Sequence, residues 1–491
     1  MKKSSLILAA TALSLAGIAL TSCNGQEQPK QAKYVFYLIN DGTGVNVALG
    51  YEMMQAEMQG RLGRQPSCMA SFPVVGMAST YSMSSDVTDS AASGTALATG
   101  HKTYNGALGV DADTIPVTSI ADWAHAMGIP VGIATSVNVN HATPGAFYGN
   151  VPSRNQYYDI AMTLPTTGFD FFGGSDINLE RGKDKPEVRE ELYKVFADSG
   201  YVIARGSYAD YEQKVSDGAQ RMILFQDMDV VLNGGAYSFP YNIDADGQML
   251  SVYDVMRAET DFLYRRSQQE GGKGFFLMNE IGGKIDMACH ANDAATSFSE
   301  FALADSCVRV AYDFYLQHPD ETLIVVTSDH ETGGLTLGNT FGGYATNFKL
   351  LANQTCSVDE LTRHLQSLRS ATRNRVSWEQ VKEQLGKDLG FWQGVELTAE
   401  EEDRLKNLYV KSFVGKMENE ENLYSENEPM AAAAVRMLNT KAFVGWTSVH
   451  HTAGLVAVYA IGVGAERFMG HNDNADIPFK IAEIAGYKPI E

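Results

Sequence analysis

The predicted fold depends on one stretch, Tyr34-Val35-Phe36-Tyr37-Leu38-Ile39-Asn40-Asp41-Gly42-Thr43-Gly44. Its first half is a continuous apolar run rich in aromatic and β-branched residues, which is typical of a strand buried on both faces. An aspartate and two glycines follow, so the strand is predicted to end in a polar turn. We therefore start from a buried strand with a polar carboxyl end.

Similar runs recur along the chain, separated by helical stretches such as 297–316. They predict strands at Gly128–Thr135, Met222–Phe225, Gly274–Met278, Thr322–Thr327 and Leu455–Ala460. Strands that alternate with helices predict an α/β fold with a mainly parallel central sheet and helices on both faces.

Polar residues follow these strands at their carboxyl ends, where ligands bind in open α/β sheets. They are Asp41 after the first strand, His141 and Thr143 after the second, Glu280 and Asp286 after the fourth, and Asp329 and His330 after the fifth. These side chains are therefore expected to converge on one rim of the sheet.

A second decisive stretch is Val87-Thr88-Asp89-Ser90-Ala91-Ala92-Ser93-Gly94-Thr95-Ala96, in which an acid precedes a serine that begins a helix-compatible run. One interpretation is a helix N-cap, because Asp and Ser are among the commonest caps. The other is an anion site, since the backbone N–H groups and the positive end of a helix would face a phosphoryl group attacked by Ser90.

Length and charge limit the number of domains and the classes of ligand that the chain is expected to bind. The 491 residues suffice for one large α/β domain with an insertion, or for two or three ordinary domains. A net charge of −21 argues against nucleic-acid binding through a basic face. The same charge repels anionic substrates, so a phosphate site needs local positive charge from metal ions or arginine.

The N-terminus has the pattern of an export signal. Lys2 and Lys3 precede an apolar run that ends in Leu20-Thr21-Ser22-Cys23. This ending resembles a bacterial lipobox; a plain signal peptide with a chance cysteine is the alternative. Residues 1–22 are the predicted signal peptide, and 23–33 a lipidated Cys23 with a polar tether. We expect an exported, membrane-anchored lipoprotein, periplasmic or on the cell surface.

Residues 341–440 differ in sequence pattern from the rest of the chain. They contain three capping-box patterns, which begin at Ser357, Ser377 and Thr398 and each precede a helix-favouring run. This segment is predicted to be a helical insertion above the rim, as a lid or a subunit contact. Its acidic stretch from Glu418 to Glu428 is predicted to be a solvated loop rather than a calcium site.

The candidate residues are of the types that bind metals and phosphate. They are Asp41, Asp89, Ser90, His141, Thr143, Arg154, Glu280, Asp286, His290, Asp329, His330, His450 and His451. Mixed Asp/His sets suit Zn²⁺ and all-oxygen sets suit Mg²⁺. Two metals can hold the attacking and leaving oxygens of an in-line phosphoryl displacement, with Ser90 as nucleophile and Arg154 clamping the phosphate.

Individually, each residue has a structural interpretation as a turn, a cap or a core histidine. Together they resemble the alkaline phosphatase family, from about residue 34 to 340 and again from 441 to 491. The resemblance lies in Asp41-Gly-x-Gly44, Thr88-Asp-Ser90-Ala-Ala-Ser-Gly-Thr-Ala96, Lys102-Thr-Tyr-Asn-Gly-Ala-Leu-Gly-Val110, Ala142-Thr-Pro144 with Ser153-Arg154, Gly282-Gly-Lys-Ile-Asp286 with His290, Ser328-Asp-His330-Glu-Thr-Gly-Gly334, and His451-Thr452. The 341–440 insertion resembles the family's crown only in position.

The resemblance implies a role for each matched residue. Ser90 is the implied nucleophile, and Asp89, Arg154 and His141 are the implied substrate ligands. Two zinc ions and one magnesium ion are the implied cofactors. Their implied ligands are Asp286, His290 and His451 for the first zinc, Asp41, Asp329, His330 and Ser90 for the second, and Asp41, Thr143 and Glu280 for magnesium.

Three positions depart from the family's pattern. The family usually has Glu directly before the Gly-Gly pair, but Ile281 stands there and Glu280 is one residue earlier. A one-residue shift turns a strand side chain to the other face, so either a bulge restores Glu280 or the third metal site is weakened. His141 stands where the best-known bacterial members have Asp, and Met287 replaces a residue that is polar, basic or Trp in many members.

The sequence thus predicts a phosphomonoesterase that works through a phosphoserine on Ser90. The alternatives are a phosphodiesterase or sulfatase-like hydrolase on the same scaffold, or a non-catalytic phosphate-binding lipoprotein. The expected partners are small phosphate monoesters and, by resemblance, a second copy of the chain.

Overall fold

The computed structural model describes residues 30–180, 182–227, 238–247, 249–415 and 417–490. The predicted signal peptide, Cys23 and most of the tether lie outside the described residues, so the lipid anchor and the exported location stay predictions, as does the homodimer. Within the described ranges, none of the helices combines the length and the apolar character needed to cross a membrane.

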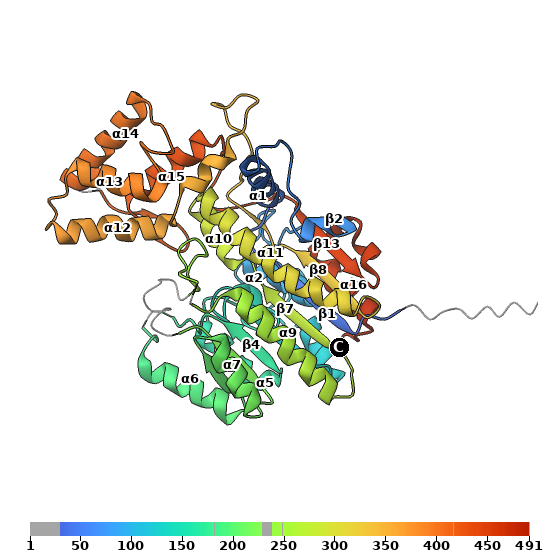
Figure 1. The fold of residues 1–491 in the computed structure, drawn as a ribbon. Coiled ribbons are helices and arrows are strands. Elements are labelled where there is room, and N and C mark those ends of the chain that lie inside the picture. The colour runs from blue at the N-terminus through green and yellow to red at the C-terminus, as the bar shows by residue number, and fades with distance from the viewer. Residues whose placement is uncertain (1–29, 181, 228–237, 248, 416, 491) are drawn as a thin grey trace, which may run out of the picture.

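A ten-stranded sheet forms the centre of the molecule (Figure 1). Its strands are β1 (Tyr34–Ile39), β2 (Val74–Ser79), β3 (Val131–Thr135), β4 (Phe171–Gly174), β5 (Val202–Arg205), β6 (Met222–Phe225), β7 (Phe275–Glu280), β8 (Thr322–Thr327), β13 (Val456–Gly462) and β14 (Gly470–Asp473). They follow the order β14-β2-β13-β8-β1-β7-β3-β4-β6-β5. Only β13 runs antiparallel to its neighbours in this sheet, so the predicted mainly parallel sheet is confirmed.

Helices cover both faces of the sheet (Figure 1). Outside the insertion they are α1 (Val45–Met58), α2 (Ser90–Thr99), α3 (Ile120–Ala126), α4 (Ala142–Gly145), α5 (Tyr157–Thr167), α6 (Pro186–Asp198), α7 (Tyr208–Ser216), α9 (Val252–Gln269), α10 (Gly283–His290), α11 (Ala294–Gln317) and α16 (Ile477–Ala485). Alternate residues of β1 point into two cores. Phe36 and Leu38 pack with α1, α9 and α11, whereas Val35 and Tyr37 pack with α2, α3, α5 and α16.

All six predicted strands are present: β6 and β8 have the predicted ends, and the ends of the others shift by a few residues. Four strands of the large sheet were not predicted: β2, β4, β5 and β14. Two of them are only weakly β-like in sequence, since β4 is Phe-Phe-Gly-Gly and β14 is Gly-His-Asn-Asp. They form because a neighbouring strand is available for pairing, β3 and β6 for β4 and β2 for β14.

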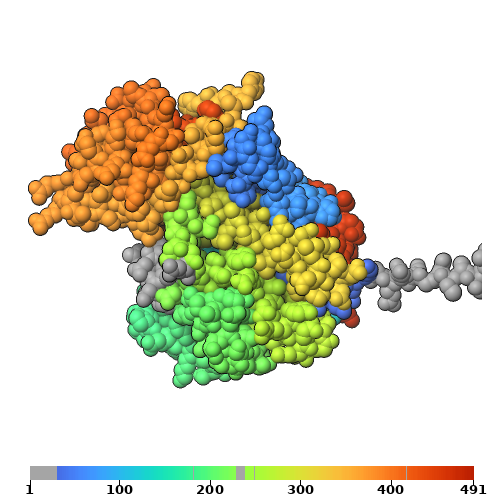
Figure 2. Space-filling view, viewed as in Figure 1, coloured from blue at the N-terminus to red at the C-terminus, as the bar shows by residue number. Residues whose placement is uncertain are grey.

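Among its described residues the insertion carries four α-helices, which project as a lobe from the main body (Figures 1 and 2). They are α12 (Val358–Ala371), α13 (Trp378–Leu389), α14 (Ala399–Tyr409) and α15 (Pro429–Lys441). The first three begin at the predicted caps, where Ser357, Ser377 and Thr398 each accept a hydrogen bond from a backbone N–H of the first turn. The helices expected from these patterns are confirmed.

Four of the five glutamates in the acidic stretch 418–428 are exposed, as predicted for a solvated loop, but the stretch is more regular than a loop. It forms a small hairpin of β10 (Glu420–Glu421) and β11 (Glu426–Asn427), followed by a buried Glu428. Arg436 holds Glu420 with two hydrogen bonds of 2.7 and 2.9 Å, and Arg369 holds Glu428 at 2.7 Å. These arginines of the neighbouring helices neutralise two of the five glutamates, and the local sequence could not reveal this pairing.

Asp244 joins the main body to the start of the insertion. Its raised pKa predicts that the stability of the protein depends on pH. Its carboxylate accepts hydrogen bonds from the Ser357 backbone N–H at 2.7 Å and hydroxyl at 2.6 Å. Burial raises the pKa of Asp244 to about 6, and the nearby Glu360 adds to the rise. The folded state therefore keeps a proton that the unfolded chain has already lost between about pH 4 and 6. This contribution to stability is fully present at the acidic end of that window and falls as the pH rises.

Asp244→Asn removes this dependence. Because asparagine resembles the protonated carboxyl, we expect the native protein and this variant to have similar Tm values near pH 4, and the Tm of the variant to rise increasingly above that of the native protein towards pH 7. The corresponding change in the free energy of unfolding is at most about 3 kcal/mol. Scanning calorimetry across this pH range measures the difference, and a Tm difference independent of pH would contradict the assignment.

Candidate active site

Ser90 is the first residue of α2. Its hydroxyl faces a histidine that comes from a distant part of the sequence. Asp89 caps the helix by accepting a hydrogen bond from the Ala92 backbone N–H at 3.0 Å. The Ser90 Oγ lies 3.0 Å from His330 Nε2, and both side chains are buried. The N-cap and anion-site interpretations of this stretch are thus compatible, because Asp89 serves as the cap and leaves Ser90 facing the polar centre.

A first group of possible metal ligands contains Asp286 and His290 from α10 and His451 from β12 (His451–Thr452). His290 Nε2 lies 3.4 Å from Asp286 Oδ1 and 3.1 Å from His451 Nε2. The residues four apart in sequence do share one face of a helix. The neighbouring candidate, His450, is exposed, so His451 is the one that reaches the centre.

A second group contains Asp41, Asp329 and His330. Asp41 follows β1 and Asp329 follows the adjacent parallel strand β8, so both side chains emerge at the same edge of the sheet. His330 Nε2 lies 3.3 Å from Asp41 Oδ1 and 3.4 Å from Asp329 Oδ2. Thr143 donates weak hydrogen bonds of 3.5 and 3.3 Å to the two carboxylates.

In each of the three histidines of these groups, Nδ1 is the ring nitrogen that contacts an oxygen atom of the surrounding protein. The Nδ1 atoms of His290 and His451 lie 2.6 and 2.8 Å from the backbone carbonyls of Val449 and Thr88, to which they can only donate. Nδ1 of His330 lies 3.2 Å from the Thr332 hydroxyl. In a neutral imidazole the Nε2 atom then carries a lone pair. Two such Nε2 atoms 3.1 Å apart, beside a carboxylate, form an arrangement that a cation would stabilise.

A third group contains Asp41, His141 and Glu280. One buried atom of each lacks a hydrogen-bond partner among the described residues: Asp41 Oδ1, His141 Nδ1 and Glu280 Oε1. Buried polar atoms are rarely left unpaired. The regular ladder extends through Ile39 and Glu280, and the Glu280 side chain is fully buried at the centre. Glu280 therefore reaches the site as the last residue of its strand, without the bulge that the sequence left open.

Electrostatics at the centre favour a cation. Burial raises the pKa of Asp41, and the nearby carboxylates of Asp329, Asp286 and Glu280 raise it further. Burial likewise raises the pKa of Asp329, to about 7. Burial acts in the same direction on Asp286, but the histidines around it outweigh burial and hold its pKa well below the usual value. Burial lowers the pKa of His330, which keeps this imidazole neutral. Neutral histidines and carboxylates are the forms that bind metals.

Arg154 contacts Asp89, the residue that directly precedes Ser90. Its Nη1 donates to Asp89 Oδ2 at 3.1 Å, and its Nη2 lies 3.1 Å from His141 Nε2. Since arginine only donates, His141 accepts through Nε2, and its proton belongs on Nδ1. The structure thus brings together the three residues predicted to bind substrate. In this tautomer His141 orients Arg154, and the oxygen atoms of the third group are the ones that could hold a cation.

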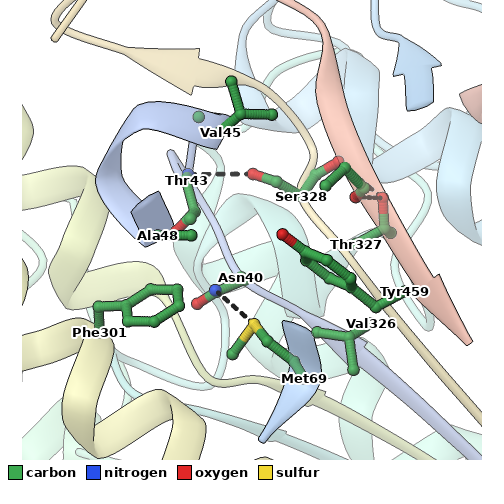
Figure 3. Close-up of a pocket in the computed structure, with 12 residues that line it drawn as sticks. Asn40, Thr43, Val45, Ala48, Met69, Phe301, Val326, Thr327, Ser328 and Tyr459 are labelled. Carbon is green, nitrogen blue, oxygen red and sulfur yellow. Dashed lines mark hydrogen bonds between the residues drawn. The ribbon is translucent and has the colours of Figure 1, made fainter. Parts of the chain in front are cut away.

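Two structural features fix the loops that carry Asp41 and Asp329. A hydrogen bond of 3.1 Å joins the Thr43 backbone N–H to Ser328 Oγ at the edge of a small cavity, which is also lined by Asn40, Met69 and Tyr459 (Figure 3). Gly42 adopts a φ of +69°, and a Cβ there would lie 2.6 Å from the Asp286 Cα. Only glycine allows the first and second groups to approach so closely.

Comparison with known proteins now identifies the family. The family model described as alkaline phosphatase matches residues 32–179 and 240–487. The chain belongs to the alkaline phosphatase family. It is 30% identical to alkaline phosphatase 4 of Bacillus subtilis (strain 168) over 98% of this chain and 97% of that one. Among solved structures, the cold-active alkaline phosphatase of Shewanella sp. superposes with a TM-score of 0.74 at 28% identity, covering 92% of this chain and 99% of that one.

The alkaline phosphatase of Thermus thermophilus gives a TM-score of 0.71 at 26% identity, covering 97% of this chain and 96% of that one. The α/β fold is therefore that of alkaline phosphatases, and the chain is a metal-dependent enzyme of this family with matching groups of ligand-type residues. The family match continues through residues 341–440, where the sequence motifs showed no resemblance, and is interrupted instead at 180–239.

One residue beside the alkaline phosphatase site was missed from the sequence. Tyr424, in the turn between β10 and β11, donates a hydrogen bond of 3.1 Å to Asp286 Oδ2. Its ring centroid lies 5.2 Å from that of His290. The only signal in the sequence was an aromatic residue within an acidic stretch, and such stretches are usually solvated.

A fourth group, Cys356, His364 and Asp388, lies in the insertion of this alkaline phosphatase. His364 Nδ1 is 2.8 Å from Asp388 Oδ2, a hydrogen-bond distance, whereas the nitrogen–oxygen separations in the first two groups are 3.3 Å or more. This group is therefore a hydrogen-bonded contact. The four described cysteines, including Cys289, are buried and unpaired, so Cys289 is a packing residue.

Proposed function

We propose that the protein hydrolyses phosphate monoesters through a covalent phosphoserine on Ser90, with metal ions at the first and second groups and Arg154 clamping the phosphate. One observation carries the proposal: the Ser90 hydroxyl lies 3.0 Å from a neutral imidazole whose Nε2 lies within 3.4 Å of two buried carboxylates. The family membership supports the reaction class. The contact of Ser90 with His330, and that of Arg154 with Asp89, support the mechanism.

The donor atoms suit particular ions. The first and second groups combine imidazole nitrogen with carboxylate oxygen, which suits Zn²⁺. The third group offers Asp41 and Glu280 with Thr143 nearby, an oxygen-rich set that suits Mg²⁺. Bound there, these ions would lower the pKa of the Ser90 hydroxyl and stabilise negative charge on the oxygens that attack and leave.

The chain's own residues account for orientation and proton placement. The Ser90 oxygen forms a bond to phosphorus while the bond to the alcohol oxygen breaks, so the alcohol leaves with one proton. Water then attacks the phosphoserine, which returns Ser90 and releases phosphate. Arg154 offers a planar set of N–H donors to two phosphate oxygens. Asp89 and His141 hold that guanidinium in place, which reduces the ordering needed when phosphate binds.

The ratio of monoester to diester hydrolysis tests this proposal. We expect a larger kcat/KM for an aryl phosphate monoester than for a diester with the same leaving group, because the diester has one fewer ionised oxygen for Arg154. Arg154→Ala is expected to reduce monoester kcat/KM by roughly 10²–10³-fold and diester kcat/KM less.

Arg404→Ala is the matched control, because Arg404 pairs with Glu400 on the exposed surface of α14. It should leave both rates unchanged. A native enzyme that prefers the diester, or an Arg154→Ala variant that loses both activities equally, would refute the monoesterase proposal in favour of a diesterase or sulfatase-like activity.

A further inference from the structure

The hairpin of the insertion reaches into the centre of the site through one residue. Tyr424 lies in the turn between β10 and β11, and its hydroxyl donates to Asp286 Oδ2 at 3.1 Å. The other oxygen, Asp286 Oδ1, accepts from the Thr332 hydroxyl at 2.5 Å and lies 3.4 Å from His290 Nε2. Two hydroxyl donors, one from the insertion and one from the main body, therefore fix the plane of this carboxylate.

We propose that Tyr424 is a positioning residue for the first group: it orients Asp286 and so makes cation binding at Asp286, His290 and His451 depend on the docked insertion. The inference rests on the proposed function, because it requires a cation at the first group. Hydrogen bonds to a ligating carboxylate set its orientation, and their loss commonly weakens metal affinity 10–100-fold.

The turn itself holds Tyr424 in a defined position. Asn422 Oδ1 accepts hydrogen bonds of 2.9 Å from the backbone N–H groups of both Tyr424 and Ser425. The Asn422 backbone N–H donates to the Ser425 carbonyl at 2.9 Å and closes the turn. An asparagine that bonds to the backbone in this way is a common means of fixing a tight turn.

The ring of Tyr424 is anchored separately. It packs against a small apolar cluster of Val137, Tyr241, Met287 and Ala288. Met287 is the position where the sequence departs from many members of the family, and in this structure it supports the ring beside Asp286. The ring edge also approaches His290, with 5.2 Å between centroids and 79° between planes.

The hairpin is in turn held by two helices of the insertion. Asn427 donates to Asp359 of α12 at 2.6 Å, and Glu420 accepts two hydrogen bonds from Arg436 of α15. These contacts connect the helices of the insertion, through the hairpin, to one ligand of the first group. The final contact in this series is the hydrogen bond from the Tyr424 hydroxyl to Asp286.

Zinc titration of the full chain tests the inference. Metal-depleted protein is titrated with zinc against a chromophoric chelator, and the binding step abolished by His290→Ala is assigned to the first group. Tyr424→Phe keeps the ring and removes the hydroxyl. It is expected to weaken that step by about tenfold, to leave the other steps unchanged, and to lower kcat/KM only when zinc is limiting.

Tyr344→Phe is the matched control, because Tyr344 is fully exposed in the same insertion and should titrate like the native protein. A Tyr424→Phe titration identical to that of the native protein, or one in which every step weakens equally, overturns the inference while leaving the proposed function intact. A native protein that binds no zinc and hydrolyses no monoester overturns the proposed function first. The Tm at saturating zinc confirms that the variant is folded.

Discussion

Ser90→Ala is expected to abolish the phosphoenzyme and to lower kcat for an aryl phosphate by on the order of 10⁴-fold or more. Among the residues that the structure describes, the Ser90 hydroxyl is the only hydroxyl placed against His330 Nε2. Removing it leaves the phosphate ligands but no atom to form the covalent bond. The measurement is acid-quenched trapping of labelled phosphoenzyme, combined with steady-state kinetics.

The variant should remain folded, which makes the result interpretable. Ser90 is the first residue of α2, and the helix is capped by Asp89, which the substitution does not touch. Alanine is a better helix former than serine, so the Tm should stay within a few degrees of the native value. Ser306→Ala, on the exposed side of α11, is the control and should retain full turnover. A Ser90→Ala enzyme with normal turnover would falsify the phosphoserine mechanism.

The sequence was sufficient to predict those strands that have a recognisable local pattern of residues. Strands such as β1, β7 and β8 are continuous apolar runs, and a buried parallel strand has no other local pattern. The same logic placed Asp41, Glu280 and Asp329 at one edge, because parallel strands end there together. A strand like β14, Gly-His-Asn-Asp, has no such pattern and exists through its pairing with β2.

Side-chain direction at strand ends was beyond the sequence. Whether Glu280 points into the site depends on where β7 stops and the chain turns, and that turn is set by a contact with another strand. A Cβ on Gly282 would lie 2.5 Å from the backbone of Asn40 and Asp41. The close approach of Gly282 to the loop after β1 depends on tertiary structure, and the local sequence does not show it. Tyr424 was inaccessible for the same reason, since it meets Asp286 from 138 residues away.

Metal removal is expected to abolish turnover and to lower the Tm, and the metal content of three variants should separate the groups. Asp41 belongs to both the second and the third groups, whereas Glu280 belongs only to the third and His451 only to the first. Asp41→Asn should therefore lose up to two bound ions per chain. Glu280→Gln and His451→Ala should lose one each. Elemental analysis of the purified proteins after equilibration with zinc and magnesium gives these numbers.

The physical reason is the charge that the ions neutralise. Burial and mutual repulsion raise the pKa values of Asp41 and Asp329, so removing the ions leaves carboxylates that favour the ionised form less in the folded protein than in water. An ion present at a thousand times its Kd adds about 4 kcal/mol to the free energy of unfolding. The metal-induced rise in Tm should thus be smallest for Asp41→Asn, and Ser90→Ala should keep most of it. If chelation leaves the activity intact, or if Glu280→Gln loses as many ions as Asp41→Asn, the assignment of ligands to groups is wrong.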